Sequence, residues 1–94
     1  MIGEIWKKLL HKARAVDKQE KIDTIRDMLE HDRDENDNSS NPNVTLRKDY
    51  EFALGVVIGM RFDSRVDSEN FASVLRERLC GIPLRDKYWK VANL

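Results

Sequence analysis

The chain has 94 residues, of which 36% are charged, and its 17 basic and 17 acidic side chains cancel. This length allows one domain at most, and a lone cysteine with two histidines excludes an internal disulfide and a Cys/His zinc site. The charge is uneven, because residues 17–37 hold nine acids against four bases, and an acidic middle is not typical of a strong DNA-binding protein.

The first thirty residues carry two apolar stripes at helical spacing. The first is formed by Ile2, Ile5, Trp6, Leu9, Leu10, Ala13 and Val16, and the second by Ile22, Ile25, Met28 and Leu29. At about 100° per residue the second stripe is rotated by roughly 150° from the first. Asp17 and Glu20 resemble a capping box, so we expect a break or bend at 15–17.

Residues 31–44 are almost wholly polar and contain Pro42, and we expect them to form a flexible loop. The residues Asp32, Asp34 and Asn36 match the first three ligand positions of a calcium loop. However, Asp37 stands where that loop needs glycine, and Asn43 where it needs a bidentate glutamate. The sequence therefore predicts no metal site and no cofactor.

A long apolar segment follows the predicted loop. Thr45 is a good helix cap, and the nine residues 52–60 carry no charge and point in nearly every direction on a helical wheel. A buried strand at 54–60 is the alternative, which the β-branched run 56–58 supports, but the length from Thr45 to about Phe62 favours a helix. We expect this helix to be central and buried.

Two shorter helices are predicted in the last third. Asp67 or Ser68 opens the first, and Gly81 ends it. Residues 84–94 form a short last helix after Pro83. The sequence thus predicts one all-α domain over residues 1–94, a small bundle of four to five helices around the central apolar helix.

The sequence contains no recognisable set of catalytic side chains, so we do not expect the chain to be an enzyme. Cys80 follows a predicted helix, where the negative end of the dipole disfavours a thiolate, and we expect it to be buried and unreactive. No glycine-rich phosphate loop is present, and the acidic run in residues 17–37 is typical of a solvated helix face.

The best candidates for a protein interface are Gly55, Gly59, Phe52 and Trp6. Gly55 and Gly59 fall on one helix face, with Phe52 beside them, and small residues at this spacing let a second backbone approach closely. Packing inside the chain's own core is the alternative. Trp6 either packs in the core or, with lysines opposite it, binds a membrane surface, and core packing is favoured.

A second surface combines basic and aromatic residues that would suit phosphate contact and base stacking: Arg76, Arg78, Arg85, Lys87, Tyr88, Trp89 and Lys90. An ordinary charged rim is the alternative. The sequence favours a non-catalytic regulator, adaptor or inhibitor that binds another protein and self-associates as a homodimer, with nucleic-acid binding as the alternative. No signal peptide or transmembrane run is visible, so we expect a cytoplasmic location.

Overall fold

The computed structural model describes residues 17–94. It contains α2 (Lys18–Asp37), α3 (Val44–Met60), α4 (Phe71–Arg78) and α5 (Asp86–Ala92), and the described residues include no strand. The predicted all-α class is confirmed, and residues 54–60 are helical and do not form the alternative strand. The predicted first helix, Trp6 and the break at 15–17 lie outside the described residues, apart from Asp17.

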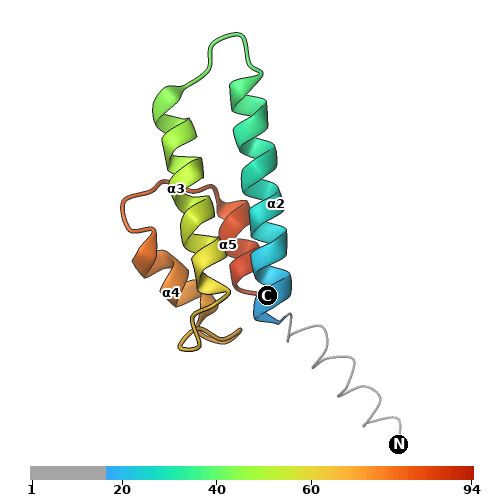
Figure 1. Ribbon diagram of the computed structural model, residues 1–94, viewed down its shortest axis with the longest axis vertical. Helices are drawn as coiled ribbons and strands as arrows, with labels where there is room; N and C mark the ends of the chain where they lie inside the picture. The colour runs from blue at the N-terminus through green and yellow to red at the C-terminus, as the bar shows by residue number, and fades with distance from the viewer. Residues whose placement is uncertain (1–16) are drawn as a thin grey trace, which may run out of the picture.

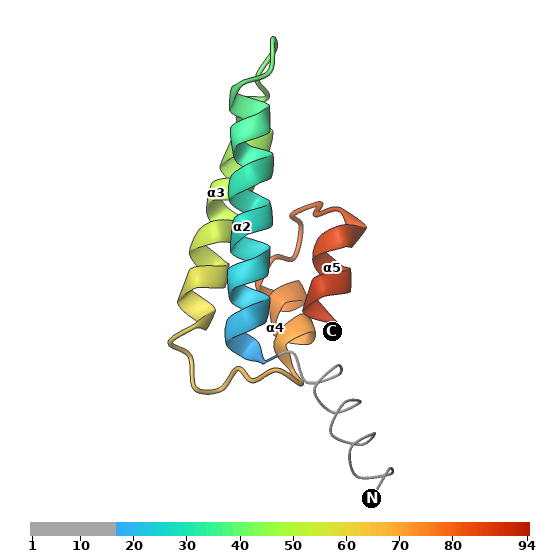
Figure 2. The same cartoon turned by 90° about the vertical axis from the view of Figure 1, so that its right-hand side faces the viewer.

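The helices α2 and α3 run antiparallel as a hairpin, and α4 and α5 lie beside the half of the hairpin that is farther from its connecting loop (Figures 1 and 2). The shared core joins all four helices. Its most buried large side chains are Tyr88, Phe71, Ile22, Ile25, Leu29, Met60, Leu75 and Val57. The stripe predicted at residues 22–29 therefore faces the core, as its helical spacing requires.

The two long helices begin at side-chain caps. Asp17 accepts a hydrogen bond from the backbone N–H of Glu20 at 2.8 Å, which confirms the predicted cap of α2. The cap of α3 is Asn43, which accepts from the backbone N–H of Leu46 at 2.9 Å, so the prediction of Thr45 was wrong. Asparagine caps at least as well as threonine, and it comes first in the chain.

The predicted loop at 31–44 was wrong over its first half, because α2 continues through Asp37. Side-chain pairs within the helix stabilise these polar residues in the helical conformation. For example, His31 Nε2 lies 3.3 Å from the Glu35 carboxylate one turn later. The connection between α2 and α3 is then short, from residue 38 to 43. The Asn36 side chain closes it, donating to the Asn43 carbonyl at 2.9 Å and accepting from the Asn43 N–H at 3.1 Å.

The helix predicted to open at Asp67 or Ser68 begins slightly later, at Phe71. Asp67 nevertheless organises the turn before it, since its carboxylate accepts from the N–H groups of Glu69 and Asn70, each at 2.9 Å. The helix α4 ends at Arg78 with Leu79 as its C-cap, two residues before the predicted stop at Gly81, and Gly81 adopts the left-handed conformation, with φ of +88°, in the turn that follows.

The sequence predicted that α3 would be buried on all sides, but the structure leaves one side of α3 exposed. Ala53, Val57 and Met60 are fully buried, but Phe52 and Phe62 are exposed on another side. The described residues supply only three other helices, and α3 packs mainly against α2 and less extensively against α4. Within residues 17–94, one face of this apolar helix is therefore left uncovered.

Candidate functional site

The uncovered side of α3 presents an apolar surface that we call the α3 face, made up of Phe52, Gly55, Ile58, Gly59 and Phe62. Phe52 is 55% exposed, Ile58 42% and Phe62 80%. They are three of the five large hydrophobic side chains that are exposed within residues 17–94. Scattered exposed hydrophobics are ordinary, but a contiguous group of them typically marks a binding surface.

The helical period places these residues together. Phe52, Gly55, Gly59 and Phe62 are separated by three, four and three residues, which keeps them within about 80° of arc at about 100° per residue. Phe62 lies two residues after the last helical residue, Met60, and its backbone N–H still bonds to the Gly59 carbonyl at 3.2 Å. The turn thereby continues the face beyond the end of the helix.

No neighbouring atom in the described fold requires glycine at these two positions. A Cβ atom added to Gly55 or Gly59 would meet nothing within 4 Å, and neither residue has positive φ. The alternative that these glycines allow close packing in the chain's own core is therefore wrong for the described residues. Each glycine costs about 0.5–1 kcal/mol relative to alanine in a helix, and the fold does not recover that cost.

The five residues of the α3 face carry no charge, but the exposed Lys48 lies on the same side of α3, one turn before Phe52. A partner that covers the five residues alone would not have to desolvate an ion. None of the described helices is long and apolar enough to cross a membrane.

A buried polar contact ties α2 to α5. The Asp32 carboxylate is only 3% exposed, and it accepts hydrogen bonds from the Tyr88 hydroxyl and from Lys87 Nζ, which lies 2.9 and 2.7 Å from its two oxygens. Burial by itself raises the pKa of Asp32, but the hydrogen bonds from Lys87 and Tyr88 outweigh it and lower the pKa. Burial and the bond to Asp32 raise the pKa of Tyr88, so its hydroxyl stays protonated.

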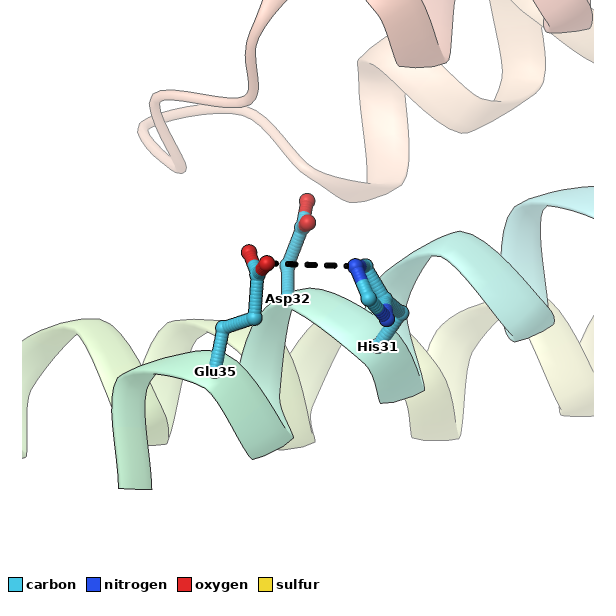
Figure 3. Close-up of side chains that lie close together, drawn as sticks. All are labelled: His31, Asp32 and Glu35. Atoms are coloured by element: carbon cyan, nitrogen blue, oxygen red, sulfur yellow. Dashed lines mark ion pairs between the residues drawn. The ribbon is translucent and has the colours of Figure 1, made fainter. Parts of the chain in front are cut away.

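Asp32 also belongs to a group of possible metal ligands with His31 and Glu35 (Figure 3), whose donor atoms lie within 4.8 Å of one another. His31 and Glu35 are exposed and turn toward each other, as Figure 3 shows. Both oxygens of Asp32 are already bonded to Lys87 or Tyr88. A metal would have to displace an ammonium group from Asp32, so this group is best explained as a helix anchor.

A second charged cluster holds the segment between α3 and α4. The Asp63 carboxylate lies 3.0 Å from Arg65 Nη2 and 2.5 Å from Arg78 Nη2. Hydrogen bonds from Arg65 and Arg78 hold the pKa of Asp63 well below its usual range. The Lys18 ammonium of α2 donates to the Asp63 carbonyl at 2.8 Å, so this cluster joins three segments of the fold.

The basic and aromatic residues proposed for nucleic-acid contact do not form one open surface. Tyr88 is 1% exposed, and Arg78 and Lys87 are paired with Asp63 and Asp32. Trp89 is only partly exposed, and the Arg76 guanidinium stands 4.4 Å from the centre of its ring. Two further members of the set, Arg85 and Lys90, are exposed. A base stacking on Trp89 would therefore compete with Arg76.

The structure also corrects the expectation for Cys80, which is exposed rather than buried. It follows the end of α4 and precedes Gly81, in the turn where the chain leaves the core.

Comparison with protein-family models, curated proteins and solved structures found no significant match to this chain. A functional conclusion therefore has to rest on the residues of the chain itself.

Proposed function

We propose that the chain is a non-catalytic protein-binding module of the regulator, adaptor or inhibitor kind, and that the α3 face is its binding surface. The observation that carries this proposal is the joint exposure of Phe52 and Phe62 beside Gly55 and Gly59. Aromatic side chains supply much of the binding energy in protein interfaces, and the glycines leave room for a partner backbone between them.

Two features of the fold support this use of the surface. The opposite side of α3 is fixed in the core by Ala53, Val57 and Met60, all 0% exposed, so the α3 face is presented on a rigid support. A preorganised surface binds at a lower entropic cost than a mobile one. The exposed phenyl rings also contribute little to the core, so their presence favours a role outside the folded monomer.

Affinity capture with a matched pair of variants tests the proposal. The variant Phe52→Glu/Phe62→Glu places two charges on the α3 face, whereas Thr24→Glu/Ser73→Glu makes the same change in charge at two exposed positions on other helices. We expect proteins bound by the wild type and the control to be lost from the face variant. Binding that persists equally in both variants, or no binding by the wild type, would rule out the α3 face as the binding surface.

A further inference from the structure

The α3 face has an internal symmetry. Phe52, Gly55, Gly59 and Phe62 are placed symmetrically about position 57, at distances of five and two residues on each side. The pattern extends to the rims of the face, where Val56 and Ile58 flank the same position. The order of aromatic, glycine, glycine and aromatic is therefore the same in either direction along the helix.

The centre of this pattern coincides with the outermost line of α3. At about 100° per residue, the midpoint between Gly55 and Gly59 lies opposite Val57 on the helix. Val57 is 0% exposed, so the midpoint of the face points directly away from the core. A two-fold axis perpendicular to α3 at this level would bring together two identical faces.

Such an axis relates residue i of one copy to position 114 minus i of the other, since twice 57 is 114. Phe52 then stands opposite Phe62 of the second copy, and Gly55 opposite Gly59. Each glycine pair admits the facing backbone, and a phenyl pair closes each end of the contact. The open space around both glycines within the described fold leaves this approach unobstructed by the chain's own side chains.

Charge favours the antiparallel arrangement over the parallel one. The exposed Lys48 lies on the same side of α3 as the two glycines, nine residues before Val57. In a parallel pair it would face Lys48 of the second copy, and like charges in contact are unfavourable. In the antiparallel pair it faces the segment after Phe62, where Asp63 is already paired with Arg65 and Arg78 and Asp67 presents an exposed negative charge.

We propose that the occupant of the α3 face is a second copy of this chain, docked antiparallel about a two-fold axis beside Gly55 and Gly59. This inference rests on the proposed function in using the same surface, and it adds the identity and orientation of the partner. The contact is short, because Phe52 to Phe62 spans only about 15 Å of helix. The dimer should accordingly be reversible and dependent on concentration.

Sedimentation equilibrium of the purified chain tests the association. We expect a mass approaching twice the 11.0 kDa of the chain at high micromolar concentration, with dissociation on dilution. The variant Gly55→Gln/Gly59→Gln should raise the dimer Kd by about tenfold or more, because its side chains hold the helices apart. The control Thr24→Gln/Ser73→Gln makes the same kind of change at exposed helix positions off the face and should dimerise normally.

Loss of folding would not mimic this result. Both glycine positions are open and helical, so the glutamine variant should unfold at a urea concentration no lower than that of the wild type when both are dilute monomers. A wild-type monomer at high micromolar concentration, or a dimer unaffected by Gly55→Gln/Gly59→Gln, would overturn the inference. A monomer that still captures another protein through the α3 face would leave the proposed function standing.

Spin labels test the orientation. In a Cys80→Ser background, a label at Thr45→Cys lies twelve residues from the axis in each copy, so an antiparallel pair separates the two labels by about 36 Å along the helix. A parallel pair would keep them under about 20 Å apart, since packed helices lie only 8–10 Å apart. A dipolar distance near 40 Å supports the proposal, and one under 20 Å contradicts it.

Discussion

The Tyr88 hydroxyl of α5 donates a hydrogen bond to the buried carboxylate of Asp32 on α2, 56 residues earlier in the chain. Asp32 accepts from Lys87 as well, so one carboxylate holds two successive side chains of the last helix. The short helix α5 (Asp86–Ala92) needs tertiary contacts such as this one, because seven residues are too few to form a stable helix alone.

The first prediction concerns this contact. Tyr88→Phe removes one hydrogen bond and leaves the ring in place, and it should lower the free energy of unfolding by about 1–2 kcal/mol. Asp32→Ala leaves the Tyr88 hydroxyl buried without an acceptor and should cost more, about 2–3 kcal/mol. Urea denaturation measures both. Equal stability of wild type and Asp32→Ala would show that α5 is held by apolar packing alone.

The second prediction follows from the lowered pKa of Asp32, with an ordinary value of 3.8. A carboxyl whose pKa is lower in the folded state stabilises the fold above its unfolded pKa, and this contribution is lost as the pH falls through the folded pKa. Asp63, whose pKa is also lowered, acts in the same direction. The free energy of unfolding should therefore fall below about pH 4. Asp32→Asn should show a smaller fall, and an identical pH profile would assign the effect to other groups.

The third prediction uses the open space at Gly55 and Gly59. Gly55→Ala and Gly59→Ala should each raise the free energy of unfolding of the dilute monomer by about 0.5–1 kcal/mol, because alanine has less backbone entropy to lose and meets no neighbour. Thermal or urea unfolding at low protein concentration measures the gain. A loss of stability at either position would reveal an intramolecular contact that the fold described here lacks.

The fourth prediction concerns Gly81, whose φ is +88°. Gly81→Ala forces an alanine into the left-handed region and should cost about 1–2 kcal/mol. The neighbouring Cys80→Ala is a suitable control, since Cys80 is exposed and its replacement should change stability by less than about 0.5 kcal/mol. Similar values for the two variants would mean that the turn after α4 tolerates another conformation.

The fifth prediction is the site of first cleavage by a protease of broad specificity. We expect it within residues 38–42, which are exposed and outside any helix. Residues 31–37 belong to α2 and should be protected, with Asp32 buried against α5. Mass spectrometry of the first fragments locates the cut. A first cut inside 52–60 would contradict the assignment of α3 as a folded core helix.

The sequence by itself determined the helical class, the cap at Asp17, the turn at Gly81 after α4 and the apolar segment from Phe52 to Met60. These are local properties, because periodicity, caps and the conformational freedom of glycine depend on residues within a turn or two of each other. The same local reasoning failed at residues 31–37. Their polarity favours a loop, but His31 pairs with Glu35 within the helix, and Asp32 is bonded to Lys87 and Tyr88 of the distant α5.

Only the tertiary structure decided which face of α3 remains uncovered. The run from Phe52 to Met60 is apolar on all sides, so its sequence does not distinguish the buried Val57 from the exposed Ile58. That distinction depends on where α2 and α4 pack, which is set by contacts between residues far apart in the chain. The burial of Tyr88 was likewise invisible in a basic and aromatic tail, because its partner Asp32 lies on another helix.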